Sequence, residues 1–368
     1  WLTQALTLLG EKPCLIGTNG NGFWGNLEST TFTTPEAVLL QSILHRYIKQ
    51  GASSLVMEVS SHGLSQHRVA GIPFLIGVFT NLTRDHLDYH GDMEAYYQAK
   101  KQLFLSPSMG YAIIHIDDPY GKRLSNELKK ERPELEILGY GVNKQAHIHL
   151  HTVNESQEGI ELNLTSPWGD IQLFHPHLIG FFNAQNLAAS FAVLCVLGFE
   201  ASLSAKILSG IKPAKGRMQV LKEKGKPLVI IDYAHTPDAL QKALTVLKPA
   251  AQAGKLYCVF GCGGNRDQGK RSLMGQVVEE TADYAVVTSD NPRDEDPIEI
   301  IADIIKNIHP KIVETDRKKA IQWAIEQANE GDVVLIAGKG HENYQEIKGT
   351  RYPFDEDEIA LHYLKDKQ

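Results

Sequence analysis

The sequence has few cysteines and no long hydrophobic run, and each shortage excludes a class of protein. Only four of its 368 residues are cysteines, and they lie in apolar stretches. This usage favours buried free thiols in a reducing compartment over a disulfide-stabilised secreted fold. The longest apolar stretch, around residues 187–199, is too short and too mixed to span a bilayer, and no signal peptide is evident. We therefore expect a cytoplasmic protein without a membrane segment.

Positive charge is also in short supply. Lys and Arg number 37 against 44 Asp and Glu, so the formal net charge is −7 at pH 7. This balance argues against general nucleic-acid binding, although a few local cations could still hold a small anion. The hydrophobic content of 42% and charged content of 22% are those of a globular protein with sizeable cores. A length of 368 residues predicts two domains.

The beginning of the chain lacks two features. Residues 1–9 have a helical pattern that ends at Gly10, but neither a capping residue nor an initiator Met precedes them. Residues 17–22 read GTNGNG, which is rich in glycine but lacks the Lys-Ser/Thr pair with which a phosphate loop reaches phosphate and Mg²⁺. We therefore expect a chain that starts inside a helix, with an upstream segment missing, and a glycine-rich turn at residues 17–22.

The most informative stretch runs from Leu55 to Lys101. Residues 55–59 and 75–80 are apolar runs bounded by turn residues, which predicts two buried, adjacent strands. In an open α/β sheet, ligands collect beyond the carboxyl ends of the strands. Polar residues follow both strands and suggest a metal or phosphate site at one rim: Glu58, His62, Asp85, His86, Asp88 and His90. Residues 93–105 then have helical spacing and carry Lys100 and Lys101.

The remainder divides into a mixed part and a regularly alternating part. Three segments alternate apolar and polar residues like antiparallel strands at a sheet edge: 147–153, 159–164 and 169–175. A helix is expected at 182–197 and a linker at 209–216, where glycine and proline cluster. Beyond the linker, helical patterns alternate with strand-like runs: 228–232, 256–260, 284–288 and 333–337. This alternation predicts an α/β fold with a parallel, doubly wound sheet.

Distinctive loops follow these strands, in the order EVSSHG-x-x-QHR, TNL-x-RDHLDYHG, Y-x-x-AK, DYAHTPDAL, GCGG-x-RD-x-GKR, DNPR and GKGHE. Together they resemble the Mur ligases, most closely the members that add 2,6-diaminopimelate, over essentially the whole chain. The resemblance implies a central ATPase domain with a mostly parallel sheet at residues 1–212. It implies a C-terminal Rossmann-like domain at residues 213–368. The family's UDP-binding domain and its phosphate loop, G-T-N-G-K-T-T, would precede Trp1.

The resemblance also implies an activity, namely an ATP-dependent amide ligase of peptidoglycan synthesis that serves cell-wall biogenesis, cell shape and cell division. ATP would convert the D-glutamyl carboxylate of a UDP-muramoyl dipeptide into an acyl phosphate, which the amine of meso-diaminopimelate attacks. Positioning and charge neutralisation would supply the catalysis. The implied cofactors are Mg²⁺ and ATP, and the implied partners are small-molecule substrates of a cytoplasmic monomer.

In the central domain the resemblance assigns Mg²⁺ to Glu58 and His86 and a carbamate to Lys100. Glu58 suits a hard cation, whereas His86 taken alone would suggest zinc or manganese. A carbamate forms on a neutral amine and so requires a lysine with a depressed pKa, but spacing alone does not separate Lys100 from Lys101. The positions that match the UDP-muramoyl dipeptide site are Thr33, Thr34, Ser60, Gln66 and Arg68. Phe32 replaces the family's Asn before the threonine pair, which puts one substrate hydrogen bond in doubt.

The resemblance extends to the nucleotide and the acceptor. The implied ATP-binding residues are Asn183, Asn186, Arg217 and Asp232, although helix capping explains the asparagines equally well. The implied diaminopimelate-binding residues are Arg266, Asp290, Asn291, Pro292, Arg293, Gly338 and Glu342. Diaminopimelate differs from lysine by one distal carboxylate, which a bidentate Arg293 would select while Glu342 receives the distal ammonium. Lysine-adding relatives lack arginine at this position.

Three alternatives remain at this point. The acceptor could differ, as in a lysine-adding Mur ligase or a folylpolyglutamate synthase, but Arg293 argues against both. A divalent-metal hydrolase would use Asp85, His86, Asp88 and His90, yet it leaves the loops of the second domain unexplained. Finally, without a phosphate loop, residues 1–368 alone are expected to bind ATP very weakly, to turn over negligibly and to hold diaminopimelate loosely.

Overall fold

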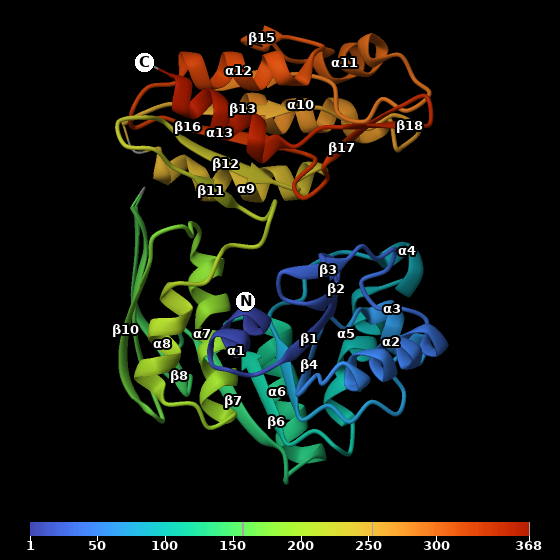
Figure 1. Cartoon of the computed structure of the whole chain (residues 1–368), viewed down its shortest axis with the longest axis vertical. Helices are drawn as coiled ribbons and strands as arrows, with labels where there is room; N and C mark the ends of the chain where they lie inside the picture. The colour runs from blue at the N-terminus through green and yellow to red at the C-terminus, as the bar shows by residue number, and fades with distance from the viewer. Residues whose placement is uncertain (157, 252, 368) are drawn as a thin grey trace. The chain divides into compact units, whose positions relative to one another are not determined.

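The computed structural model describes residues 1–156, 158–251 and 253–367, which fold into two α/β units (Figure 1). Unit 1 comprises Trp1–Asn154, Glu161–His175 and Phe182–Lys212. Unit 2 comprises Glu155–Ile160, Pro176–Phe181 and the chain from Pro213 onward. Two short pieces that precede residue 212 therefore belong to unit 2.

Unit 1 contains two sheets. Sheet A has the order β3-β2-β1-β4, and β1 pairs with β2 antiparallel and with β4 parallel. Its strands are β1 (Pro13–Gly17), β2 (Gly20–Phe23), β3 (Asn26–Glu28) and β4 (Ser54–Met57). Sheet B has the order β10-β9-β8-β7-β6-β5, and β5 to β8 are parallel. Its strands are β5 (Ile76–Phe79), β6 (Tyr111–His115), β7 (Glu136–Gly141), β8 (Ile148–Ser156), β9 (Gly159–Ser166) and β10 (Gly169–His175). A two-residue link joins only antiparallel neighbours, so the predicted antiparallel edge is confirmed for β9 and β10. The segment predicted as its first strand, β8, pairs parallel with β7 instead.

Several helices of unit 1 begin at a residue whose side chain caps the helix. The Asp92 side chain accepts a hydrogen bond from the Ala95 N–H, and Asp118 does the same for Gly121 ahead of a helix that starts with Pro119. The predicted helix at 93–105 is α-helical to Lys101, and its last turn tightens to a 3₁₀ helix. The helices are α1 (Leu2–Leu8), α2 (Ala37–Lys49), α3 (Ser61–Ser65), α4 (Leu87–His90), α5 (Met93–Lys101), η1 (Gln102–Leu105), α6 (Pro119–Glu131), α7 (Phe181–Val196) and α8 (Ala201–Ser209).

The two strands before the polar loops do not share a sheet, so the expectation of one common rim was wrong. β4 is the edge strand of sheet A, and β5 is the edge strand of sheet B. Apolar side chains of both strands, among them Leu55, Met57 and Ile76, line a cavity of about 580 Å³. A period-two apolar run predicts a strand but does not say which strand it pairs with.

Unit 2 is built on sheet C, whose order is β11-β12-β16-β13-β14-β15. The pairs from β12 to β15 are parallel, and β11 joins the edge antiparallel. The predicted parallel, doubly wound sheet is therefore confirmed. The strands are β11 (Gln219–Leu221), β12 (Leu228–Asp232), β13 (Leu256–Phe260), β14 (Tyr284–Val287), β15 (Ile312–Val313) and β16 (Val333–Ala337). A separate antiparallel hairpin consists of β17 (Tyr344–Ile347) and β18 (Thr350–Pro353).

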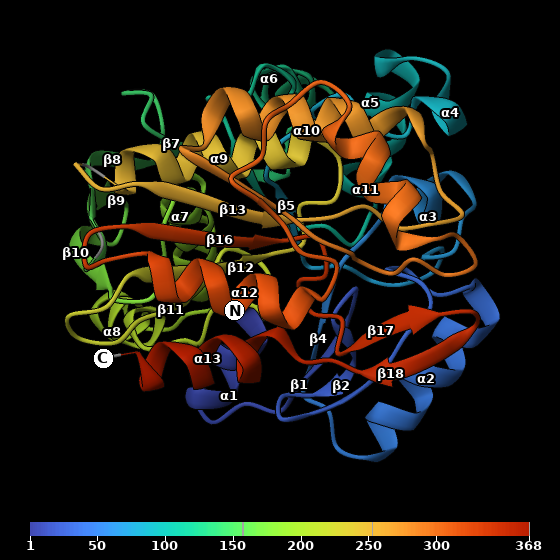
Figure 2. The same ribbon diagram turned by 90° about the horizontal axis from the view of Figure 1, so that it is seen from above.

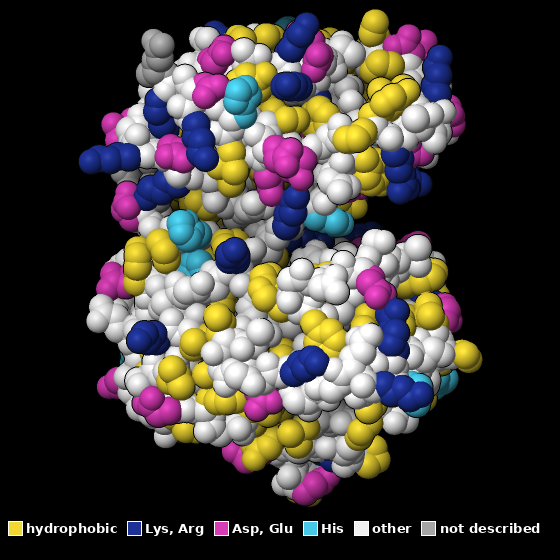
Figure 3. All heavy atoms as spheres, in the orientation of Figure 1, with side chains coloured by type: hydrophobic (Ala, Val, Ile, Leu, Met, Phe, Trp, Pro, Cys, Tyr) yellow, Lys and Arg dark blue, Asp and Glu magenta, His cyan; other side chains and the backbone are white. Residues whose placement is uncertain are grey.

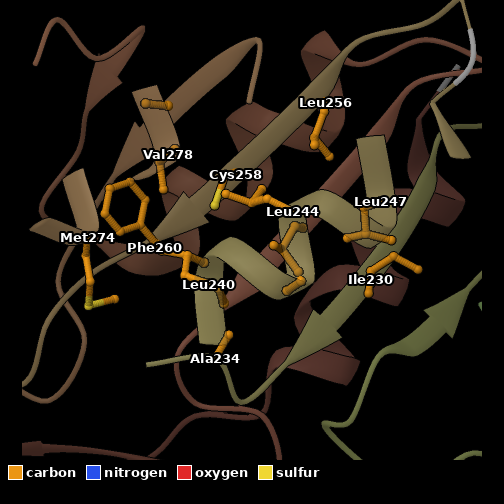
Figure 4. Close-up of a cluster of buried hydrophobic side chains, with 14 of the residues drawn as sticks. Ile230, Ala234, Leu240, Leu244, Leu247, Leu256, Cys258, Phe260, Met274 and Val278 are labelled. Carbon is orange, nitrogen blue, oxygen red and sulfur yellow. The ribbon is translucent and has the colours of Figure 1, made fainter. Parts of the chain in front are cut away.

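Helices cover both faces of sheet C, as Figure 2 shows. Leu240 and Leu244 pack with Ile230 and Phe260 in one buried cluster, drawn in Figure 4. Ile231 belongs to the cluster on the other face, together with Ile321. This alternation explains the near-continuous apolar strands, because each residue meets a helix on one face or the other. The helices are α9 (Pro237–Ala250), α10 (Gly269–Thr281), α11 (Pro297–Ile305), α12 (Arg317–Gln327) and α13 (Glu356–Asp366).

All four cysteines are buried and free, as their apolar contexts predicted. Within the described residues, none of the helices combines the length and hydropathy that crossing a bilayer requires. On the face shown in Figure 3, Lys and Arg side chains are interspersed with Asp and Glu.

Candidate functional site

Glu58 lies just beyond the carboxyl end of β4, where the sequence placed a metal ligand. Its Oε2 accepts a hydrogen bond of 2.7 Å from the Thr18 hydroxyl, and Thr18 in turn lies 2.9 Å from the Thr33 hydroxyl. A Cβ on Gly17 would come within 2.7 Å of Glu58 Oε1, so the glycine makes room for the carboxylate. Thr18 was not predicted as a site residue, because its stretch was interpreted only as a turn.

The predicted dipeptide-binding residues form one hydrogen-bonded group beside Glu58. Thr34 is buried, and its hydroxyl donates to the Glu58 carbonyl and accepts from the Ser60 N–H. Arg68 Nη1 donates to the Thr34 carbonyl at 2.9 Å, and Arg68 Nε donates to Gln66 Oε1 at 2.8 Å. The structure therefore brings together the side chains that the motif comparison assigned to one substrate.

His86 lies in a cluster of histidine and tyrosine rings. Its ring centroid is 4.9 Å from that of His62 and 5.9 Å from that of Tyr96. His90 stacks on Tyr96 at 5.0 Å, and its Nε2 lies 2.9 Å from the Ser61 hydroxyl. Burial lowers the pKa of His90, as it does that of His62.

The described residues contain no group of three or more His, Cys, Asp or Glu side chains arranged to hold a metal ion. The alternative metal site at Asp85, His86, Asp88 and His90 is therefore not formed in this structure. The donor chemistry of Glu58 still fits a hard cation, because its exposed carboxylate keeps lone pairs beyond the one that Thr18 occupies. Mg²⁺ retains several waters in most protein sites and needs only one or two protein ligands.

Lys100 and Lys101 have opposite surroundings, which the sequence could not distinguish. Lys101 Nζ donates to Glu127 and Glu131 at 2.8 and 2.7 Å. Burial by itself would lower the pKa of Lys101, but these hydrogen bonds outweigh burial and raise that pKa. Burial lowers the pKa of Lys100, against the attraction of Asp85, and its Nζ lies 5.6 Å from the Tyr96 ring centroid. Since a carbamate forms on a neutral amine, the surroundings favour Lys100.

In unit 2, a pocket of about 220 Å³ lies at the carboxyl ends of the parallel strands. We call it the Arg293 pocket. It is lined by Tyr233, His235, Gly261, Cys262, Gly263, Arg266, Lys270, Asp290, Asn291, Arg293, Gly338 and Glu342. Every predicted diaminopimelate-binding residue except Pro292 lies on this lining. Pro292 instead supports the loop, because its carbonyl accepts from the Glu295 N–H and occupies the space beside Gly264 where a Cβ would stand.

The backbone of Arg293 is held in a left-handed conformation by the β17–β18 hairpin. Its φ is +51°, which is uncommon for a residue with a side chain. The Arg293 N–H donates to the Glu346 carbonyl, and the Lys348 N–H donates to the Arg293 carbonyl. Arg293 Nη1 donates to the Gly264 carbonyl at 2.9 Å, and Nε lies 3.5 Å from the Glu346 carboxylate. A guanidinium carries five N–H donors, so Arg293 retains donors for a carboxylate beyond these two contacts.

The acidic side chains of the pocket, Glu342 and Asp290, are also held by close contacts. Asn291 Nδ2 donates to Glu342 Oε2 at 2.9 Å, and the Glu342 side chain is 20% exposed. Gly338 has φ +123°, and a Cβ there would come within 2.6 Å of Asp290 Oδ2. Below them Arg317 and Glu356 form a fully buried pair at 2.6 Å, and Arg317 also donates to the Ala337 carbonyl.

The predicted nucleotide-binding residues are divided between the two units. Asn183 and Asn186 lie in the first two turns of α7 (Phe181–Val196), rather than ahead of it. Asp232 accepts from the N–H groups of Met218 and Ala234, and burial raises the pKa of its carboxyl. The guanidinium carbon of Arg217 lies 5.0 Å from the ring centroid of Tyr233. The sequence did not predict three other residues of the pocket lining as site residues, although they lie in the motifs DYAHTPDAL and GCGG-x-RD-x-GKR: Tyr233, His235 and Lys270.

Two family profiles match most of the chain. Residues 1–194 match the Mur ligase middle domain, and residues 216–340 match the profile described as Mur ligase, glutamate ligase domain. These two matches cover sheets A, B and C, and the β17–β18 hairpin lies beyond them.

Individual proteins match over nearly the full chain. A Neisseria meningitidis serogroup A protein named UDP-N-acetylmuramoyl-L-alanyl-D-glutamate–2,6-diaminopimelate ligase is 52% identical over 362 residues, which are 98% of this chain and 73% of that protein. A Chromobacterium violaceum protein of the same name is 50% identical over 367 residues, 99% of this chain and 74% of its own. A solved structure of a ligase with that name superposes with a TM-score of 0.76 at 39% identity, covering 99% of this chain and 75% of that structure.

Proposed function

This chain belongs to the Mur ligase family, and we propose that it catalyses the ATP-dependent addition of meso-2,6-diaminopimelate to UDP-N-acetylmuramoyl-L-alanyl-D-glutamate. Two relatives with this name are 52% and 50% identical to it over 98% and 99% of this chain. The observation that carries the choice of acceptor is that Arg293 and Glu342, which have opposite charges, line one pocket.

The reaction joins a carboxylate to an amine in two steps. The D-glutamyl carboxylate takes the terminal phosphoryl group of ATP, which gives an acyl phosphate and ADP. The amine of diaminopimelate then attacks the acyl carbon. The C–N bond forms, the C–O bond to phosphate breaks, and phosphate and a proton leave. The protein contributes position and charge, because the acyl phosphate already supplies the good leaving group.

The Arg293 pocket would hold the far end of diaminopimelate, which carries a carboxylate and an ammonium. Arg293 would bind the carboxylate through its remaining N–H donors, with Arg266 as a second cation on the lining. Glu342 would receive the ammonium, with Asp290, Asn291 and Gly338 shaping the wall. We assign Pro292 to this site as the residue that fixes the loop between Asn291 and Arg293.

In unit 1 we assign the UDP-muramoyl dipeptide to the hydrogen-bonded group of Thr33, Thr34, Ser60, Gln66 and Arg68. Its hydroxyl, amide and guanidinium groups suit a phosphate-bearing peptide. Glu58 and His86 would hold Mg²⁺, which neutralises phosphate charge when bound, and Lys100 would carry the carbamate. Asn183, Asn186, Arg217 and Asp232 would contact ATP. The proposal places this chemistry in a cytoplasmic monomer, with residues 1–212 as the central domain and 213–368 as the C-terminal domain.

Binding of the acceptor tests this proposal directly. We expect the wild-type chain to bind meso-diaminopimelate more tightly than L-lysine in isothermal titration calorimetry. Arg293→Met should weaken binding of diaminopimelate by about 10- to 100-fold, the loss expected for a charge-assisted hydrogen-bonded pair. Arg293→Lys should retain only part of the wild-type affinity for diaminopimelate, because an ammonium lacks the planar pair of N–H donors that a guanidinium offers to a carboxylate.

Arg351→Met is the matched control, because Arg351 is exposed on β18 and does not line the pocket. It should leave both affinities unchanged. Equal binding of lysine and diaminopimelate by the wild type would favour the lysine-adding alternative. An unchanged diaminopimelate affinity in Arg293→Met would remove the basis for this acceptor.

A further inference from the structure

Lys339 is a fully buried cation directly behind the Arg293 pocket. It follows β16 and Gly338, and its side chain is 0% exposed. Its Nζ donates to Asn291 Oδ1 at 2.6 Å and to the Tyr344 carbonyl at 2.9 Å. Neither the pocket lining nor the proposed reaction includes Lys339. A buried ammonium is costly to desolvate, so its partners indicate what it does.

These contacts fix the orientation of the Asn291 side-chain amide. The backbone N–H of Glu346 can only donate, and it meets the same Oδ1 at 2.9 Å. The carboxylate of Glu342 can only accept, and it meets Nδ2 at 2.9 Å. Lys339 and the Glu346 N–H are donors, and Glu342 is an acceptor. Only one of the two orientations of the Asn291 amide therefore satisfies all three partners.

The same ammonium also acts on Glu342 through space. Lys339 Nζ lies 3.9 Å from Glu342 Oε2, beyond hydrogen-bond range but close enough for charge attraction in a buried setting. Glu342 is therefore held from two directions, by the amide of Asn291 and by the charge of Lys339. Its remaining lone pairs stay available to the pocket.

We propose that Lys339 is the positioning residue of the Arg293 pocket, fixing the Asn291 amide so that Glu342 stands where it receives the second ammonium of a diamino diacid. The proposal rests on the proposed function, since it presupposes diaminopimelate as the ligand. The two charges of the pocket have different direct contacts. Arg293 contacts the Gly264 carbonyl and the backbone of Glu346 and Lys348, whereas Glu342 contacts Asn291 and Lys339, and Lys339 itself meets the hairpin at the Tyr344 carbonyl. Without Lys339 the Asn291 Oδ1 loses its charged donor and Glu342 loses the positive charge beside it, so the Glu342 carboxylate is held less firmly.

Two ligands distinguish these parts in calorimetry. meso-Diaminopimelate carries a second ammonium, and (S)-2-aminopimelate keeps both carboxylates but lacks that amine. We expect Lys339→Met to weaken diaminopimelate binding by about 10- to 100-fold, the range for hydrogen bonds to charged groups. Binding of 2-aminopimelate should stay within about twofold of wild type. A general collapse of the pocket would weaken both ligands together.

Methionine has a similar volume to lysine and removes a buried charge, so the variant is expected to fold. Asn291→Asp provides a second test, because its carboxylate keeps acceptors for Lys339 and the Glu346 N–H but faces Glu342 with like charge. It should show the same selective loss of diaminopimelate binding. Lys306→Met, at an exposed position after α11, is the control and should bind both ligands as wild type does.

The outcomes are distinguishable from failure of the proposed function. If the wild type binds neither ligand, the acceptor assignment itself is wrong. If the wild type binds diaminopimelate and Lys339→Met binds it equally well, Lys339 does not position Glu342. Equal losses for both ligands in Lys339→Met would show that Lys339 only maintains the fold, and this too would overturn the inference.

Discussion

Two adjacent residues of the same type can differ in chemistry because different side chains surround them, as Lys100 and Lys101 show. Both are lysines in the last turn of α5. Lys101 is bound by two carboxylates of α6, whereas Lys100 lies against Tyr96 with a pKa that burial lowers. An ammonium bound by two carboxylates resists deprotonation, so only Lys100 is suited to become a carbamate.

Gly338 provides a test of strain at a single residue. We expect Gly338→Ala to lower the free energy of unfolding by more than about 2 kcal/mol, because a positive φ and a clash with Asp290 act together. Gly349→Ala is the matched control, with φ +74° and open space around the new methyl group, and should cost about 1 kcal/mol. Urea denaturation measures both. Equal losses would show that the close approach of Asp290 contributes nothing.

Among the elements, the β17–β18 hairpin determines how the pocket is built. It is not hydrogen-bonded into sheet C as a further strand. Instead it pairs with the loop after β14 through Arg293, and the Gln345 side chain donates to the Asp290 carbonyl at 2.7 Å. The loop that carries the predicted specificity residues therefore has a fixed conformation before any ligand binds.

The packing of α5 against α6 should respond to acid. Burial tends to raise the pKa of Glu127, but hydrogen bonds from Lys101, Arg123 and Tyr97 outweigh it and lower that pKa to about 2. A depressed carboxyl pKa stabilises the folded state above the unfolded value, about 4.3, and this contribution is lost as pH falls toward 2.

We therefore expect Glu127→Gln to be less stable than wild type at pH 7 by about 1 kcal/mol, a value reduced for solvent screening at a partly exposed group. The gap between the two proteins should close between about pH 5 and pH 2. Thermal denaturation of both proteins across this range measures it. A gap that is independent of pH would mean that the charge of Glu127 is not responsible.

On the scale of the whole molecule, the proposed sites fall in different units. The residues proposed to bind diaminopimelate all lie in unit 2, and those proposed to bind the dipeptide and Mg²⁺ lie in unit 1. Hydrogen–deuterium exchange with and without meso-diaminopimelate should therefore show slower exchange in the loops of unit 2, around residues 261–266, 290–293 and 338–342. Exchange around residues 58–68 of unit 1 should not change. Protection confined to unit 1 would contradict the assignment.

The sequence by itself determined the α/β class, the strands β12, β13, β14 and β16 of sheet C, and part of the lining of the Arg293 pocket, including Arg293 and Glu342. Apolar runs of strand length and polar loops at their carboxyl ends are local signals, and the motifs name the residues in those loops. The tertiary structure alone decided that β4 and β5 lie in different sheets, that Lys100 and Lys101 differ, and that Lys339 supports the pocket from behind. These depend on which distant segments meet, because strand pairing, desolvation and buried hydrogen bonds are properties of the neighbours that folding brings together.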